Sequence, residues 1–139
     1  MTVPFPLLPR PLRWGGVVLV AAVICYFSLL AVPPETPAPG GLALPTWRHV
    51  LAYFGLGLSV AYAIADWPLS RRRKALLIVL IVTGYGAAIE LGQAFVPERH
   101  ASLTDVLING VAAATSLVWY LLEPRVRFVH VGSAEPTEP

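Results

Sequence analysis

The sequence predicts an all-α membrane protein, a bundle of four transmembrane helices with both termini in the cytoplasm. Three observations carry this prediction. Of the 139 residues, 56% are hydrophobic and only 13% are charged, against roughly 25% charged residues in soluble domains. The apolar residues form four long runs, each long enough for a span. The clusters of Lys and Arg flank these runs on the same side of a four-span bundle, which the positive-inside rule assigns to the cytoplasm.

The membrane domain is predicted to cover residues 14–122, with spans at about 14–32, 47–66, 75–96 and 105–122. The first run contains no charged residue between Arg13 and Glu35, enough to cross a hydrocarbon core of about 30 Å. Two prolines at 33 and 34 end it. The same run is compatible with a signal peptide, but it exceeds the usual ~7 to 15 apolar residues of such a segment, which favours an uncleaved span.

Residues 1–13 are predicted to be a cytoplasmic segment, and 123–139 a cytoplasmic, disordered tail, because this tail is polar and rich in proline. The loops 33–47 and 97–104 then lie outside the cell. This orientation depends on eight basic residues, which are Arg10, Arg13, Arg71, Arg72, Arg73, Lys74, Arg125 and Arg127. Small residues also recur at helical spacing and predict close helix packing, in the sets Gly84, Ala88, Gly92 and Gly55, Ser59, Ala63.

The composition excludes several function classes. The 10 Lys and Arg residues nearly balance the 8 Asp and Glu residues, which argues against a nucleic-acid partner. The single cysteine, Cys25, allows no intrachain disulfide. No cofactor motif is present, and no metal is expected, although Glu90, His49 and Asp105 could hold one chemically. The expected partners are membrane lipids and a lipid-linked envelope substrate, and self-association is left open.

Polar residues concentrate where the predicted spans reach the outer surface. Pairs at helical spacing occur near the ends of three spans, namely His49 with Tyr53, Glu90 with Gln93, and Asp105 with Asn109. A carboxylate inside a span costs roughly 2.5 kcal/mol or more at the bilayer centre, so Glu90 requires a partner. Arg99 in the following loop is the expected partner, because its guanidinium can hold a carboxylate bidentately. Ser102 or Thr104 is the expected N-cap of the fourth span.

The same residues carry a resemblance to a known family. The run from Glu90 to Asn109 resembles the motif E-x-x-Q-x-F-x-P-x-R-x-x-S-x-x-D-x-x-x-N of VanZ-like membrane proteins and matches all of its fixed positions. His49-x-x-x-Tyr53-x-x-Leu56 is similar to a second motif of that family. Two departures are Pro45-Thr46, where the family often has Asp-Lys, and Ala112 in place of a glycine. The resemblance implies a small multi-span membrane protein, linked in some members to glycopeptide resistance of the teicoplanin type.

Three functional hypotheses follow. The first is a membrane enzyme acting on a lipid or lipid-linked envelope molecule, with Glu90 or His49 as the general base and Asp105 as a second acid. Its substrate-binding residues would be Tyr53, Gln93, Arg99, Ser102 and Asn109. The second is a noncatalytic protein in which the polar motif binds an envelope molecule or mainly locks the helices together. The third, a transporter, is disfavoured because the inner halves of the spans are almost entirely apolar. Whether the protein is an enzyme stays open.

Overall fold

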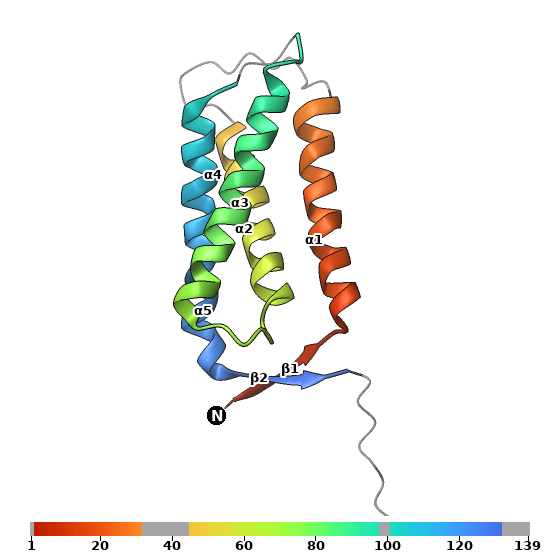
Figure 1. The fold of residues 1–139 in the computed structure, drawn as a ribbon, viewed down its shortest axis with the longest axis vertical. Coiled ribbons are helices and arrows are strands. Elements are labelled where there is room, and N and C mark those ends of the chain that lie inside the picture. Colours follow the sequence, from red (N-terminus) through yellow and green to blue (C-terminus); the bar gives the residue numbers. More distant parts are fainter. Residues whose placement is uncertain (1, 32–44, 98–100, 132–139) are drawn as a thin grey trace, which may run out of the picture.

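The computed structural model describes residues 2–31, 45–97 and 101–131, which form a helical bundle standing on a two-stranded sheet (Figure 1). The elements in chain order are β1 (Val3–Leu7), α1 (Arg10–Cys25), the π-helical turn η1 (Tyr26–Leu30), α2 (Pro45–Ala63), α3 (Arg71–Gln93), α4 (Leu103–Thr115), the 3-10 turn η2 (Ser116–Val118), α5 (Trp119–Leu122), the 3-10 turn η3 (Glu123–Arg125) and β2 (Val126–His130). The end of the bundle at β1 and β2 is called the sheet end, and the opposite end is called the motif end.

Each predicted span overlaps a helical segment, which is α1 with η1, α2, α3, and α4 with η2 and α5. Within the described residues, three helical segments are long and apolar enough to cross a membrane, at Arg10–Leu30, Arg71–Gln93 and Leu103–Arg125. The helix α2 has 19 residues and is outside this group. The observed helices α1 and α3 begin four residues before the predicted spans, because their first turns carry charged residues that an apolar run excludes. Ser70 starts α3 by accepting a hydrogen bond from the Arg73 N–H at 3.4 Å.

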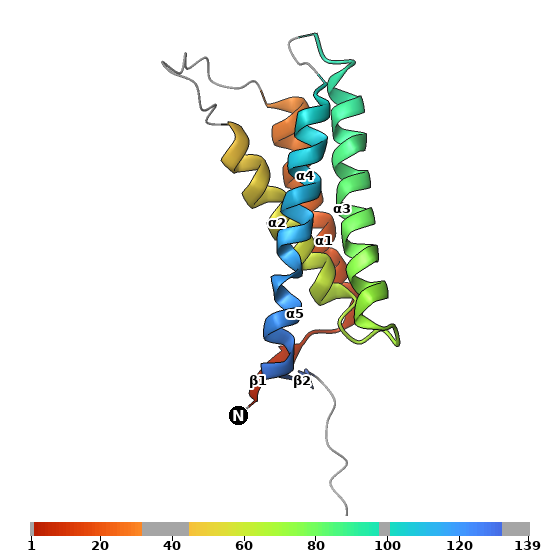
Figure 2. The same ribbon diagram turned by 90° about the vertical axis from the view of Figure 1, so that its left-hand side faces the viewer.

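The helix α2 runs obliquely through the bundle (Figure 2) and packs against α1, α3 and α4. It supplies much of the buried core through Tyr53, Leu56 and Val60, and Ile64 follows in the turn after the helix. Ile78 and Val82 come from α3, and Ala112 and Ala113 from α4. The central position of α2 joins the two ends of the molecule: its N-terminal turns lie at the motif end and its C-terminus lies at the sheet end.

The expectation of an all-α protein is wrong at the sheet end. The strands β1 and β2 pair in parallel, from Val3 opposite Val126 to Leu7 opposite His130. Residues 126–130 are therefore a strand rather than the start of a disordered tail, while residues 132–139 lie outside the described chain. Contacts distant in sequence hold the sheet in place, because the Phe5 ring packs edge-on against the Tyr62 and Phe128 rings. The strand β1 is not predictable from the sequence, because two of its five residues are prolines, which disfavour a strand.

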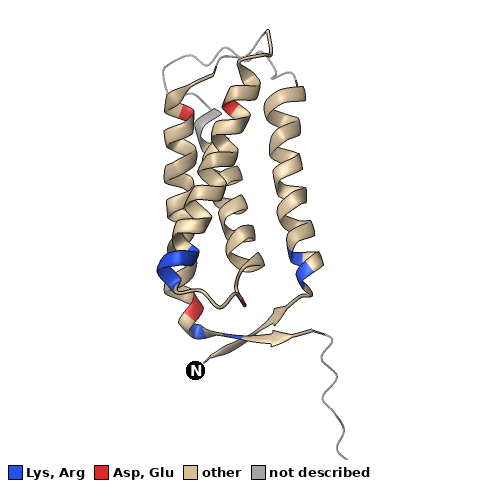
Figure 3. Ribbon diagram, viewed as in Figure 1, with Lys and Arg blue, Asp and Glu red and all other residues tan. Residues whose placement is uncertain are grey.

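Charged side chains also join the helices at the sheet end, where most of the described Lys and Arg residues gather (Figure 3). The Arg13 side chain is 1% exposed and meets Asp66 through two hydrogen bonds of 2.9 Å. It also donates to two carbonyls in the last turn of α2. The Lys74 ammonium donates to the Ala65 carbonyl at 2.5 Å. These cations from α1 and α3 therefore bind carbonyls at the end of α2 and in the turn after it, where the helical hydrogen-bond pattern stops.

The predicted stripes of small residues coincide with the packing faces only in part. A Cβ atom added at Gly84 or Gly55 would meet nothing within 4 Å, and Ala88 is exposed. Gly92 of the predicted stripe is a close approach, since a Cβ there would lie 3.2 Å from the Leu29 side chain, and Ala63 is fully buried. Two glycines outside the stripes also lie at close approaches. A Cβ at Gly57 would collide with the Ser116 side chain, and Gly86 faces the motif residues described below.

Candidate functional site

Glu90 is a buried carboxylate near the C-terminus of α3, with 3% of the residue exposed. Its Oε2 accepts a hydrogen bond of 2.9 Å from the Ser102 N–H, at the start of α4. Its Oε1 is also buried and has no hydrogen-bond partner among the described residues. One oxygen is thus anchored by backbone, while the second has unused capacity to accept hydrogen bonds.

A pocket of about 290 Å³ lies beside this carboxylate, between α3 and α4. Apart from Glu90 and Ser102, its lining is apolar and consists of Ala87, Leu91, Ala101, Leu103 and Val106. The pocket is partly open to its surroundings. An apolar, open pocket with one carboxylate suits an amphiphilic molecule that brings a hydrogen-bond donor beside an apolar chain.

Ser102, one of the two residues that the sequence offered, is the N-cap of α4. Its Oγ accepts from the Asp105 N–H at 3.3 Å while its own N–H binds Glu90. Asp105 lies half-buried in the first turn of α4. The unpaired N–H groups of a helix N-terminus stabilise negative charge, which suits a carboxylate at this position. Ser102 thus serves two parts of the motif, because it starts α4 and holds Glu90.

His49, Tyr53 and Asn109 meet between α2 and α4. The His49 Nδ1 atom lies 3.3 Å from Asn109 Oδ1, and since this oxygen only accepts, the imidazole is the donor. The rings of His49 and Tyr53 stack with their centroids 6.2 Å apart. Both Asn109 and Tyr53 are almost completely buried. Within the described chain, neither the Tyr53 hydroxyl nor the Asn109 Nδ2 has a hydrogen-bond partner.

Gly86 makes this close arrangement possible. A Cβ atom at Gly86 would lie 2.9 Å from Asn109 Nδ2 and 3.1 Å from Tyr53 Cε1, both tighter than ordinary contacts. Gly86 precedes Glu90 by four residues, so the two lie on one face of α3. Sequence reasoning passed over Gly86 in favour of the Gly84 stripe, although the spacing to Glu90 was a signal that pointed to it.

Gln93 lies on a different side of α3 from the contacts to α4. Its Nε2 donates to the Ser28 carbonyl at 3.1 Å, in the π-helical turn η1. Gln93 therefore joins α3 to η1, a contact that the sequence did not indicate. Ser28 had no sequence signal, because its contribution is a backbone oxygen. Arg99, the expected partner of Glu90, lies outside the described residues.

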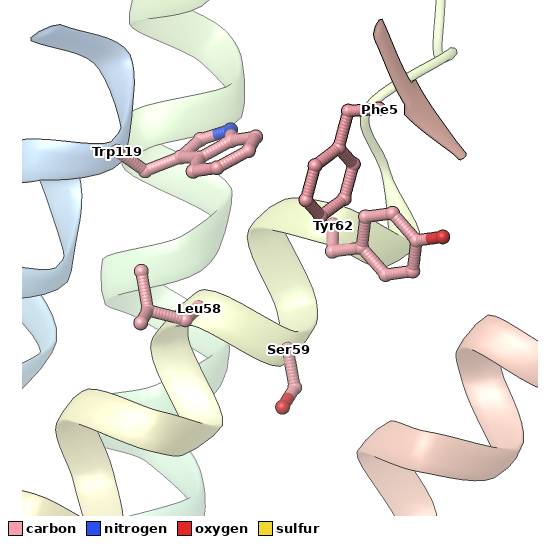
Figure 4. Close-up of a pocket in the computed structure, with 5 residues that line it drawn as sticks. All are labelled: Phe5, Leu58, Ser59, Tyr62 and Trp119. Atoms are coloured by element: carbon pink, nitrogen blue, oxygen red, sulfur yellow. The ribbon is translucent and has the colours of Figure 1, made fainter. Parts of the chain in front are cut away.

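The described residues contain no group of three or more His, Cys, Asp and Glu side chains placed to hold a metal ion. A second pocket, of about 280 Å³, lies at the sheet end and is lined by Phe5, Leu58, Ser59, Tyr62 and Trp119 (Figure 4). The hydroxyls of Ser59 and Tyr62 donate to backbone carbonyls of Gly55 and Pro6. None of the motif residues lines this pocket, so the motif end is the candidate site.

The arrangement at the motif end brings together two hydrogen-bonded pairs, Glu90 with Ser102 and His49 with Asn109. Glu90 is a base or hydrogen-bond acceptor at the edge of an apolar pocket. His49 is half-buried and its second ring nitrogen is chemically able to accept a proton. Such a site can orient a polar head group, and it contains groups able to take a proton from one.

Comparison with known proteins gives one positive result. A family model for VanZ/LLP1 matches residues 22–123, which include every site residue described above. No curated protein matches the chain, and no solved structure matches it. Since the match covers most of the sequence and agrees with the motif from Glu90 to Asn109, the chain belongs to the VanZ/LLP1 family.

Proposed function

We propose that this chain is a multi-pass protein of the cell membrane whose motif end binds or modifies a lipid or lipid-linked molecule of the cell envelope. Through this activity it would contribute to glycopeptide resistance of the teicoplanin type. The observation that carries the proposal is the Glu90 carboxylate, which is buried, held by the Ser102 N–H on one oxygen only, and adjacent to an apolar pocket.

The proposed topology has four spans, with both termini inside the cell and the motif end outside. It is supported by α2, which extends from the motif end to the sheet end alongside the three longer apolar segments. It is further supported by the location of the basic residues, since those flanking α1, α3 and η3 all lie at the sheet end. The positive-inside rule places that end in the cytoplasm.

In the catalytic form of the proposal, Glu90 takes a proton from a head group that enters through the pocket between α3 and α4. His49, oriented by Asn109, is the other candidate base, and Asp105 orients the reacting group. Arg99 would hold a phosphate or carboxylate of the substrate through its planar guanidinium. A removed base of this kind lowers an activity by roughly 10²- to 10⁴-fold.

A noncatalytic function has its own support. The motif side chains tie helices to one another: Gln93 binds the first span, Glu90 binds the start of α4, and His49 binds Asn109. Such contacts stabilise helix association in lipid, where the hydrophobic effect does not drive it. The pocket would then bind an envelope molecule without changing it.

The substitution Glu90→Gln separates the two forms. Glutamine keeps an oxygen for the Ser102 N–H but is not a base. The variant would be expressed in a glycopeptide-susceptible host beside the wild type, Glu90→Ala and the control Glu123→Gln, which alters an ion pair at the sheet end. The measurements are the inhibitory concentration of teicoplanin and the amount of each variant in the membrane.

If Glu90 is the base, Glu90→Gln reaches wild-type membrane levels but protects no better than an empty host, while Glu123→Gln protects fully. If the site only binds, Glu90→Gln retains most of the protection and Glu90→Ala loses it. Full protection by all three variants at normal membrane levels would contradict a function at Glu90.

A further inference from the structure

Three buried polar atoms without hydrogen-bond partners lie at the motif end, one from each of three helices. They are the Tyr53 hydroxyl of α2, Glu90 Oε1 of α3 and Asn109 Nδ2 of α4, unpartnered within the described chain. The three residues are 1%, 3% and 0% exposed, respectively. A buried polar atom left unpaired is destabilising, because it gives up its hydrogen bonds to water without replacement, so three in one region require an explanation.

The three side chains converge on one face of α3. Asn109 Nδ2 and the Tyr53 ring both approach the position of a Gly86 side chain, at 2.9 and 3.1 Å. Glu90 follows Gly86 by one helical turn on that face. The other polar atoms of this group are already used, because Asn109 Oδ1 binds His49 and Glu90 Oε2 binds Ser102. The unused atoms therefore belong to side chains that meet on this face of α3.

We infer that this region is a binding site for water, enclosed by Tyr53, Glu90 and Asn109. The donors and acceptors match: water accepts from Asn109 Nδ2, donates to Glu90 Oε1, and exchanges a hydrogen bond with the Tyr53 hydroxyl. Buried waters usually make about three such bonds to groups that the protein leaves unsatisfied. The water links the His49–Asn109 pair to the Glu90–Ser102 pair.

This site makes Tyr53 and Asn109 positioning residues for Glu90. A carboxylate in apolar surroundings is stabilised by hydrogen bonds to both of its oxygens. The Ser102 N–H serves one oxygen, and the bound water serves the other. The inference stands on buried atoms alone and does not require the proposed function, since its test measures water and the Glu90 carboxylate rather than resistance.

The test is infrared spectroscopy of the purified full chain in lipid nanodiscs, prepared in ordinary water and in H₂¹⁸O. The wild type should show an isotope-sensitive O–H band of bound water that disappears in Tyr53→Phe. The carboxyl band of Glu90 is identified by its absence in Glu90→Gln. This band should shift in Tyr53→Phe. Tyr85→Phe is the matched control: its ring is 6.5 Å from that of Tyr53, but its hydroxyl donates directly to the Ala21 carbonyl at 2.6 Å.

Thermal unfolding provides a second measurement, in which the two possible results shift the unfolding midpoint in opposite directions. If water pairs with the Tyr53 hydroxyl, Tyr53→Phe lowers the unfolding midpoint, as Tyr85→Phe does, because each loses a hydrogen bond. If the hydroxyl is unpaired, removing it raises the midpoint, and this result overturns the inference. A wild type without a bound-water band also overturns it, whatever the variants do.

The competing occupant is Arg99, the partner that the sequence predicts for Glu90. If its guanidinium binds Glu90 Oε1 directly, Arg99→Gln shifts the Glu90 carboxyl band while Tyr53→Phe leaves it unchanged. That combination replaces water by Arg99 and overturns the inference. A Glu90 carboxyl band that shifts in Tyr53→Phe and not in Tyr85→Phe supports the bound water.

Discussion

At the scale of single residues, the clearest stabilising contact outside the motif is the ion pair of Arg13 and Asp66. The guanidinium is 1% exposed and the carboxylate side chain 18% exposed, and two parallel hydrogen bonds join them. Arg10 adds a longer, exposed contact to the same carboxylate. The hydrogen bonds from Arg13 hold the pKa of Asp66 well below its usual range, with a smaller contribution from Arg10.

Asp66→Asn should destabilise the protein by about 3 kcal/mol, because breaking a buried pair leaves a buried charge without compensation. The matched control is Glu123→Gln. Its partner Arg71 is 62% exposed, so its loss should cost less than about 1 kcal/mol. The free energy of unfolding of each purified variant, from denaturation in mixed micelles, checks this. Equal losses in the two variants would contradict the importance of burial.

The same pair predicts a dependence of stability on pH. The pKa of Asp66 is lower in the folded protein than in the unfolded chain. The contribution of its ion pair to the free energy of unfolding is therefore complete above the unfolded pKa, about 3.9, and is lost as the pH falls through the folded pKa. The difference between wild type and Asp66→Asn should therefore be constant near neutral pH and shrink only in acid. A difference that changes between neutral and mildly alkaline pH would need another titrating group.

The sequence identified the basic residues at this end as signals of membrane orientation. The positive-inside rule does not predict which groups these residues contact. Arg13 and Asp66 are 53 positions apart, and only the packing of α1 against α2 makes them neighbours. The motif residues were easier to find, because their types and spacing are visible along the chain. Their individual partners, such as Ser28 for Gln93, were not visible.

At the scale of helices, packing depends on glycines where backbones approach one another. Gly86→Ala should destabilise the bundle by about 1 to 3 kcal/mol, the range for overpacking a tight interior, since its methyl group would displace Asn109 and Tyr53. Gly84→Ala, on the same helix, meets open space and should be neutral or slightly stabilising. Thermal unfolding in detergent compares the two. A larger loss in Gly84→Ala would contradict the packing described for α3.

The helices themselves were predictable, because a membrane span needs a run of apolar residues of a certain length. The faces through which they pack were not. Lipid is as apolar as the bundle interior, so a stripe of small residues fits either environment. Gly84 and Ala88 illustrate this, since both are exposed while Gly86, on the same helix, lies in the contact. The boundaries of α1 and α3 also extend into charged turns, where hydropathy carries no signal.

At the scale of the whole molecule, the proposed orientation predicts which end reagents reach from outside the cell. Replacing Cys25, the sole cysteine, by serine gives a background for single cysteines. Ala101→Cys at the motif end should react with a membrane-impermeant maleimide in intact cells. Val129→Cys in β2, where Val129 is 44% exposed, should react only after lysis. The reverse pattern would invert the topology, and Cys25→Ser alone is the unlabelled control.

The sequence by itself determined the mainly helical architecture, the approximate position of the helices, the family and the residues of the motif. These are properties of composition, run length and local spacing, which a chain carries before it folds. The tertiary structure decided which motif residues meet. His49 and Asn109 are 60 positions apart, and β1 pairs with β2 from the other end of the chain. Such contacts arise only when helices pack, because their energies depend on burial and geometry that no single segment possesses.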